Sequence, residues 1–286
     1  MKDYFHPRST IIDGPGQLFI HDYVQVHMIP KVDLESMSIS RLVCGTNAFC
    51  GISHFTVSRD MFLREYLTQD RIVEIMTFIL QEFGVNAIIS SPRDHIYEAI
   101  QTVQKETGEK YHWICTPSSA RETATDLPPN MAGQVQWCAD HEVSVCMPHR
   151  SYTDAKMDTM TMEIEGIEEI LADIRDHGMI PGLSTHYYDV IRICDLRNYD
   201  VSLIVQPLNV QGFQSNIEVN TLIAAIHGTK RQILNIKPLA AGRIEPEIGL
   251  NFSLNNIKPN DFVACGFSCI QDADYDCQLF QRLVFG

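Results

Sequence analysis

Residues 179–209, MIPGLSTHYYDVIRICDLRNYDVSLIVQPLN, contain two short apolar runs with a helical stretch between them. The runs cover residues 179–186 and 201–209, and both end in polar residues. A strand, a helix and a second strand in this order form a parallel pair, because the chain must cross over the sheet between parallel strands. This stretch therefore predicts an α/β fold with a parallel sheet.

The same kind of apolar run occurs eight times between residue 41 and the end of the chain, and helical stretches separate all but one pair of neighbouring runs. The six other runs are residues 41–46, 85–91, 111–116, 143–149, 231–242 and 263–268. Eight such units in about 250 residues are the number that closes a (β/α)8 barrel. We therefore predict a single TIM-barrel domain over residues 1–286, with the barrel itself in residues 41–286.

Residues 1–40 precede the first barrel strand and form a predicted N-terminal extension. The turn-forming residues DGPG at 13–16 separate two β-rich segments, which predicts a β-hairpin over residues 9–34. We expect this hairpin to cover the N-terminal mouth of the barrel, where it would have a structural role.

Composition argues against several classes of partner. The net charge is −14 and no basic run is longer than two residues, which disfavours nucleic acid and anionic membranes. No apolar run approaches the roughly 18–20 residues that span a bilayer, and the first residues lack the apolar segment of a signal peptide. The nine cysteines include no CxxC pair. These features favour a cytoplasmic protein with reduced cysteines that acts on a small molecule, and they leave the oligomeric state open.

Active sites of TIM barrels lie at the C-terminal ends of the strands. The polar residues that end the eight runs are rich in hydrogen-bond donors and poor in carboxylates, which suits a polar or anionic small molecule. The residues expected to line the pocket are Asn47, His149, His186, Gln206, Asn209 and Lys237. The residues expected to bind the substrate are Asn47, Arg150, Gln206 and Asn209.

His149 and His186 end adjacent predicted strands, so both can point into one pocket. Two histidines in this arrangement are a candidate acid–base pair, and together with Asp154 they are also candidate ligands of a divalent metal. The structural alternative is that each histidine caps its strand or orients a loop.

Lys237 lies in the apolar run ILNIKPLAAG. An ammonium there costs free energy unless it reaches solvent or an anion, so Lys237 is either a ligand of a substrate oxygen or a residue that reaches the solvent at the rim. Arg243 begins the next predicted helix, where it could bind an anion or be an ordinary exposed arginine. Cys50, Cys265 and Cys269 are better explained as structural thiols, because no histidine is tied to them by sequence.

Several stretches resemble the aldo/keto reductases and follow one another in that family's order. They are RLVCGTNAFCG (41–51), GVNAIISS (84–91), residues 182–209, KPLAAGRI (237–244) and GFSCIQ (266–271). The resemblance implies a TIM barrel and an oxidoreductase that uses NADP(H), with a cofactor site that would include Arg243, Ser268 and Gln271. KPLAAGR followed by NNIKPNDFVACGF is also similar to a bacterial group of reductase-like barrels.

The catalytic tetrad of that family is not kept, so the resemblance is to a divergent member. The expected aspartate falls at Ile89 or Ser90, and no tyrosine follows at the required distance. Pro117 replaces the lysine, and only His149 matches the family's residue. The segment QDADYD (271–276) is acidic where the family carries basic residues, and it would repel a 2′-phosphate.

Three hypotheses follow. The first is a small-molecule enzyme that acts on a polar or anionic substrate through His149, His186 and Lys237, in one version with a divalent metal. The second is an NAD(P)-dependent oxidoreductase with a replaced proton donor. The third is a non-catalytic binding or scaffold protein.

Purified protein supplied with NADPH is expected to reduce simple aldehydes and ketones little or not at all, because no tyrosine is placed to protonate the alkoxide. General acid assistance contributes roughly 10²–10⁴-fold to a rate, so its loss removes useful turnover. The measurement is the oxidation of NADPH followed by absorbance. Steady oxidation that disappears in His149→Ala would contradict this expectation and favour the second hypothesis.

Overall fold

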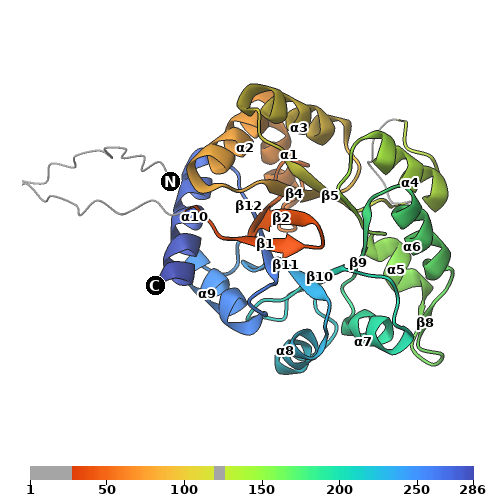
Figure 1. Cartoon of the computed structure of the whole chain (residues 1–286). Helices are drawn as coiled ribbons and strands as arrows, with labels where there is room; N and C mark the ends of the chain where they lie inside the picture. Colours follow the sequence, from red (N-terminus) through yellow and green to blue (C-terminus); the bar gives the residue numbers. More distant parts are fainter. Residues whose placement is uncertain (1–27, 119–125) are drawn as a thin grey trace, which may run out of the picture.

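Eight parallel strands close into a barrel in the computed structural model, which describes residues 28–118 and 126–286 (Figure 1). Going around the barrel, the order is β10-β11-β12-β3-β4-β5-β6-β9, so the first barrel strand pairs with the last. The strands are β3 (Leu42–Gly45), β4 (Ala87–Ser90), β5 (His112–Cys115), β6 (Val145–Cys146), β9 (Ile180–Ser184), β10 (Leu203–Pro207), β11 (Gln232–Ile236) and β12 (Phe262–Gly266). Each overlaps one predicted run and starts within two residues of the start of that run, and the predicted (β/α)8 fold is confirmed.

A layer of helices surrounds the barrel (Figure 1). They are α2 (Gln69–Phe83), α3 (Asp94–Thr107), α4 (Met131–Asp140), α6 (Ile167–Asp176), α7 (Tyr188–Arg197), α8 (Val219–Gly228), α9 (Pro246–Asn256) and α10 (Ile270–Phe285). Gly84 ends α2 with a φ of 72°, a left-handed conformation that glycine adopts without the steric cost of a Cβ. Within the described residues, no helix is both long and apolar enough to cross a membrane.

Two connections carry additional structure that the sequence did not predict. The connection after β3 contains α1 (Val57–Tyr66). The connection after β6 contains α5 (Arg150–Lys156) and a short hairpin of β7 (Met157–Asp158) and β8 (Glu163–Ile164). Both connections leave the C-terminal ends of barrel strands, so both lie at the end of the barrel where a site is expected.

Side chains alternate between the inside and the outside of the barrel along each strand. The inward residues form one buried cluster, to which every barrel strand contributes. Its members from the barrel strands and the segment after β6 are Val43, Ala87, Ile114, Val145, Met147, Ile180, Leu203, Val205, Leu234, Phe262 and Ala264. The barrel is therefore filled by apolar side chains over most of its length.

A hairpin closes the N-terminal end of the barrel. It consists of β1 (Lys31–Leu34) and β2 (Met37–Ser40), and Figure 1 shows it in front of the ring of strands. Leu34 and Ile39 are fully buried in the same cluster as the inward barrel residues. The expected structural role is thus observed, but the hairpin turns at Glu35, whereas the predicted turn at residues 13–16 lies outside the described residues.

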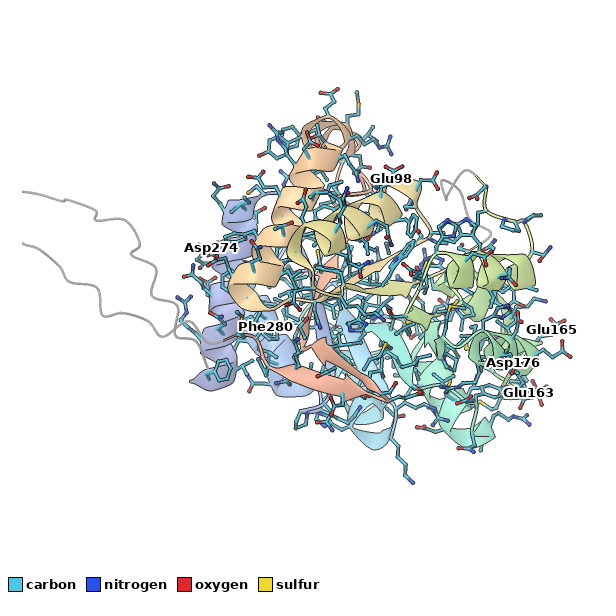
Figure 2. All side chains as sticks on the ribbon, turned by 45° about the horizontal axis from the view of Figure 1, so that its top comes forward. Glu98, Glu163, Glu165, Asp176, Asp274 and Phe280 are labelled. Atoms are coloured by element: carbon cyan, nitrogen blue, oxygen red, sulfur yellow. The ribbon has the colours of Figure 1, made fainter. Side chains whose placement is uncertain are left out.

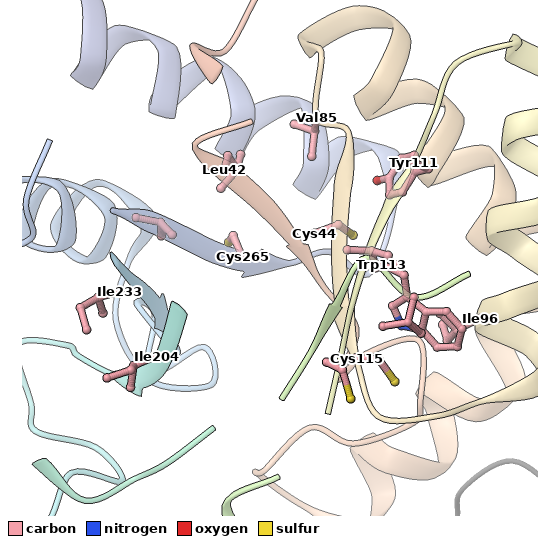
Figure 3. Packing of buried hydrophobic residues seen from close by; sticks show 14 of the residues in the cluster. Leu42, Cys44, Val85, Ile96, Tyr111, Trp113, Cys115, Ile204, Ile233 and Cys265 are labelled. Atoms are coloured by element: carbon pink, nitrogen blue, oxygen red, sulfur yellow. The ribbon is translucent and has the colours of Figure 1, made fainter. Parts of the chain in front are cut away.

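Outward residues of the strands pack against the helices in a second apolar layer (Figure 3). Leu42, Cys44 and Trp113 belong to it, and the indole nitrogen of Trp113 donates a hydrogen bond of 2.8 Å to the Ser90 hydroxyl. Trp113 also meets Trp137 edge to face, with ring centroids 5.9 Å apart. Aromatic contacts of this kind hold the helix layer against β4 and β5.

Part of the negative charge lies on the outer surface. Figure 2 shows Glu98, Glu163, Glu165 and Asp176 at the periphery of the molecule, on or beside the outer helices. All four residues are exposed. Their carboxylates are therefore solvated and far from the inward side chains of the barrel.

Truncation of the hairpin plug is expected to destabilise the whole barrel. Ile39→Ala removes a fully buried side chain, and such a cavity costs about 2–5 kcal/mol of unfolding free energy. Lys31→Ala on the same hairpin is the control, because Lys31 is exposed and surface substitutions stay within about 0.5 kcal/mol. Urea unfolding measures both. Equal stability of the two variants would show that the hairpin is not part of the core.

Candidate functional site

A cavity of about 880 Å³ opens at the C-terminal ends of the barrel strands. All eight strand ends contribute to its wall, through Thr46, Ser90, Thr116, His149, Ser184, Val205, Lys237 and Gly266. The loops after β3 and β11 complete the wall, with His54 and Ala241 among their residues. The volume lies within the roughly 300–1,000 Å³ of known small-molecule sites.

His149 is held in one tautomer by the start of α5. Its Nδ1 accepts a hydrogen bond from the Ser151 backbone N–H at 3.2 Å, and Nδ1 also lies 2.9 Å from the Ser151 hydroxyl. The Ser151 hydroxyl is in turn 2.7 Å from that of Ser118. Because Nδ1 is an acceptor, the neutral ring carries its proton on Nε2. His149 therefore caps α5 and keeps an N–H donor, so the structural and functional interpretations are compatible.

Asp154 fixes the backbone that carries His186. Its carboxylate accepts hydrogen bonds from the Thr185 hydroxyl and from the His186 backbone N–H, the latter at 3.2 Å. These bonds tie α5 to the loop after β9 and set the point from which the His186 ring extends. His186 lines the cavity, whereas Asp154 lines a shallower hollow beside it.

Lys237 follows the last residue of β11 in an unusual backbone conformation. Its φ is 59°, and Ala240 and Ala241 in the same turn also have positive φ values of 46° and 59°. A non-glycine residue in this region costs on the order of 1–3 kcal/mol, which the surrounding structure must offset. Pro238 follows Lys237 directly, and the Ala240 N–H donates to the Lys237 carbonyl at 3.0 Å. The turn therefore holds Lys237 in one direction at the mouth.

The charges at the mouth are unbalanced. Among the described residues, neither the Lys237 ammonium nor the Arg150 guanidinium has a hydrogen-bond or ion-pair partner. Arg150 is the first residue of α5 and is exposed. These two cations give their side of the cavity a positive potential that attracts anions.

Burial and this positive charge both lower the pKa values of the histidines and of Lys237. Burial, then the charges of Lys237 and Arg150, lowers the pKa of His54 to about 4 and that of His186 to about 2. Burial, then Arg150 and Lys237, lowers the pKa of His149 to about 4. Burial, then Arg150, lowers the pKa of Lys237 to about 8. At neutral pH the histidines are therefore neutral, and Lys237 has an appreciable fraction of free amine.

Gln206 and Asn209 were expected to line the pocket, but both lie outside its wall. Val205 faces the barrel interior, so Gln206 must face the helix layer, where its amide is fully buried and lacks a described partner. Asn209 holds its own loop, since its amide exchanges two hydrogen bonds with the Phe213 backbone. Gln206 is therefore outside the predicted substrate site because its strand points it outward, and Asn209 because it bonds to its own loop. Asn47 and Arg150 do line the cavity.

Arg243 was expected to bind a cofactor, but its side chain is already engaged. Its guanidinium donates to the Ala240 and His54 carbonyls at 2.9 and 3.0 Å, and it lies between the rings of Phe55 and Phe213. The distances from its central carbon to the two ring centroids are 4.9 and 4.7 Å. Arg243 therefore ties together the loops that follow β3, β10 and β11.

Ser268 and Gln271, also expected to bind a cofactor, do line the cavity. Asp272 and Asp276 line it beside them, and Asp272 accepts a hydrogen bond from the Ser268 N–H. With Arg243 engaged elsewhere, these residues do not fit the 2′-phosphate of NADP(H). Asp272 and Asp276 belong to α10, whereas Arg150, His186 and Lys237 follow β6, β9 and β11.

The metal site that the sequence suggested is not assembled. Within residues 28–118 and 126–286, no group of three or more histidine, cysteine, aspartate or glutamate side chains is arranged to hold a metal ion. Asp154 instead bonds Thr185 and the His186 backbone. Burial raises the pKa of Cys265 well above its usual value, which agrees with a structural thiol.

Two sets of hydrogen bonds around the cavity histidines were not predicted from the sequence. Ser151, which fixes the His149 tautomer, lies in a helix of seven residues that has no clear apolar period. Thr185 and Asp154 form the link to His186, which depends on two elements that are distant in sequence. His54 was noted in the sequence, but only the fold brings it to the cavity.

Comparison with models of protein families gives no match, and comparison with curated proteins also gives none. Among solved structures, a candidate aldo-keto reductase from Pseudomonas aeruginosa is similar, with a TM-score of 0.63 and 15% identity over 89% of this chain and 94% of that one. A truncated 3-deoxy-D-arabino-heptulosonate 7-phosphate synthase from Thermotoga maritima has a TM-score of 0.53 and 9% identity, over 90% and 92% of the two chains. These similarities show the TIM-barrel fold, which supports many unrelated activities.

The rings of His149 and His186 are expected to stay neutral from about pH 7.5 to about pH 5.5, because their pKa values of about 4 and about 2 lie below this range. NMR of the imidazole nitrogens measures this, with His149→Gln and His186→Gln for assignment and free imidazole as a reference that titrates near 6.5. His149 should show its proton on Nε2. A ring that titrates in this range would contradict the electrostatic description of the site.

Proposed function

We propose that this TIM-barrel protein is a small-molecule enzyme that binds an anionic substrate at the C-terminal mouth and acts on it without the reductase tetrad. The observation that carries the proposal is the pair of cations, Lys237 and Arg150, which form no ion pair among the described residues and face a cavity with neutral histidines. Lys237 is largely shielded from water, so its unpaired charge is costly and a bound anion would offset that cost. The exposed Arg150 adds to the attraction.

Arg150 is the group suited to hold the anion. Its guanidinium offers a planar set of donors that matches a carboxylate or phosphate. It begins α5, whose backbone is fixed by the His149 cap and the Asp154 hydrogen bonds. The anion would therefore bind beside both histidines.

His149 and His186 are suited to move protons. A neutral imidazole can accept a proton at one nitrogen and donate from the other, and His149 has its donor on Nε2. Lys237 would contact the substrate oxygen that gains charge during the reaction. Cys44 and Cys146 are buried and reduced, which supports the expectation of a cytoplasmic location.

An NAD(P)-dependent oxidoreductase with a replaced proton donor is the second candidate. One observation favours it: His149 ends the fourth barrel strand, at the position of the histidine in the aldo/keto reductase pattern, and presents an N–H donor. The acidic residues Asp272 and Asp276 in the cavity wall oppose binding of a 2′-phosphate, so NADH is the better candidate cofactor for this alternative.

Inorganic phosphate is expected to raise the melting temperature of the protein relative to sodium chloride at equal ionic strength, because it binds only the folded site. Each kcal/mol of binding free energy corresponds to a shift of roughly 2–4 °C for a chain of this size. Arg150→Gln should remove most of the shift. Arg282→Gln is the matched control, since Arg282 is an exposed residue of the last turn of α10.

The outcomes separate the candidates. A shift with NADH that exceeds the shift with phosphate would favour the oxidoreductase. An equal phosphate shift in wild type and Arg150→Gln would contradict the proposed anion site. Phosphate binding without any turnover across substrate classes would favour a non-catalytic binding protein.

A further inference from the structure

We propose that Lys237 is a nucleophile, which forms an imine between its Nζ and the carbonyl carbon of a substrate that also carries a carboxylate or a phosphate. This inference rests on the proposed function, because it uses the same cavity and the same anion site. It adds the chemical class of the substrate, a carbonyl compound, and a covalent step.

The position of Lys237 is the first observation. Its side chain lines the cavity, at the C-terminal end of a barrel strand, together with His149, His186 and Arg150. Among the described residues, no carboxylate pairs with the ammonium and no carbonyl accepts a hydrogen bond from it. A structural lysine would be expected to have such partners, whereas a nucleophile must be free to reach a carbon atom.

The backbone of Lys237 is the second observation. The left-handed conformation at Lys237, followed directly by Pro238, is an uncommon choice for a residue with a side chain. The positive φ of Ala240 and Ala241 and the 3.0 Å bond from the Ala240 N–H to the Lys237 carbonyl keep this turn in place. Strain that is retained at the mouth of a barrel indicates that the direction of the side chain matters.

Electrostatics is the third observation. Burial is the larger cause that lowers the pKa of Lys237 to about 8, and the charge of Arg150 adds to it, so that the amine is partly neutral near pH 8. A lysine that only binds phosphate gains nothing from losing its charge. A lysine that attacks a carbonyl requires the free amine, and a neighbouring cation is a known way to provide it.

The step balances with the groups present. The lone pair of the neutral Nζ forms a bond to the carbonyl carbon while the π bond of the carbonyl breaks; Nζ loses one proton and the oxygen gains one, which gives a carbinolamine. Nζ then loses its second proton, the carbon–oxygen bond breaks, and the protonated hydroxyl leaves as water to give the imine. His149, which has a proton on Nε2, and His186 lie in the same cavity to donate and accept these protons. No oxidant, reductant or metal is needed.

Reductive trapping tests the proposal. Purified protein is incubated separately with pyruvate, 2-oxoglutarate, glyceraldehyde and glyceraldehyde 3-phosphate in the presence of cyanoborohydride, which reduces an imine to a stable secondary amine. Peptide mass spectrometry then locates the adduct. We expect labelling of Lys237 by at least one anionic carbonyl compound to exceed that of exposed Lys31 and Lys230 by tenfold or more.

Two variants serve as controls. Lys237→Arg keeps the positive charge but cannot form an imine, so it should lose this adduct. Arg150→Gln should lower labelling by glyceraldehyde 3-phosphate more than labelling by neutral glyceraldehyde. Circular dichroism confirms that each variant is folded.

The proposal is overturned if Lys237 is labelled no faster than Lys31 and Lys230 with all four compounds, or if the Lys237→Arg protein takes up as much label as wild type. This failure is distinguishable from failure of the proposed function. If phosphate still raises the melting temperature through Arg150, the anion site stands and only the imine is excluded. If that shift is also absent, both proposals fall together.

Discussion

The alternation of side chains along eight short strands is the constraint on which the rest of this molecule depends. A residue of a barrel strand faces either the interior or the helix layer, and its neighbour faces the other way. Val205 and Gln206 show the consequence, since Val205 lines the cavity floor while Gln206 is buried outside the barrel. The same alternation runs from Val145 through Met147 to His149, which places the imidazole at the mouth.

Filling the lower barrel with apolar side chains determines where polar chemistry can occur. Leu34 and Ile39 close one end, and the cluster that includes Leu203 and Phe262 fills the middle, which leaves the C-terminal mouth as the region where inward residues meet solvent. The cations gather there although the chain as a whole carries a net charge of −14. The acids on the outer helices are thus separated in space from Lys237 and Arg150, and an anion is attracted to the side of the mouth that these two cations line, opposite in charge to Asp272 and Asp276.

The sequence predicted much of the fold because each barrel strand is a short apolar run with polar ends, and this pattern survives without any tertiary information. It also placed His149, His186 and Lys237 at strand ends, and the structure brings all three to one cavity. Arg243 could not be understood in this way, because its partners Phe55 and Phe213 come from loops that are distant in sequence. The hairpin that turns at Glu35 was not predicted, because this turn has no glycine or proline, whereas the predicted turn at the DGPG motif lies outside the described residues.

Two other features could not be predicted from the sequence. They are the direction in which residues near the strand ends point, and the short helix α5. A stretch of seven residues is too short for an apolar period, so neither the cap formed by His149 nor the hydrogen bonds of Asp154 could be anticipated. These contacts decide which ring nitrogen carries the proton and how His186 is oriented. The chemical role of each histidine therefore depends on its hydrogen bonds more than on its being a histidine.

The position of Arg243 between Phe55 and Phe213 has a mechanical consequence. Three loops of the rim share one guanidinium, so the displacement of any one of them costs contacts with Arg243. Arg243 therefore couples the positions of the three loops to one another. A molecule that enters the cavity passes a rim in which one side chain sets the spacing of these loops, so the shape of the mouth limits what can reach the lysine.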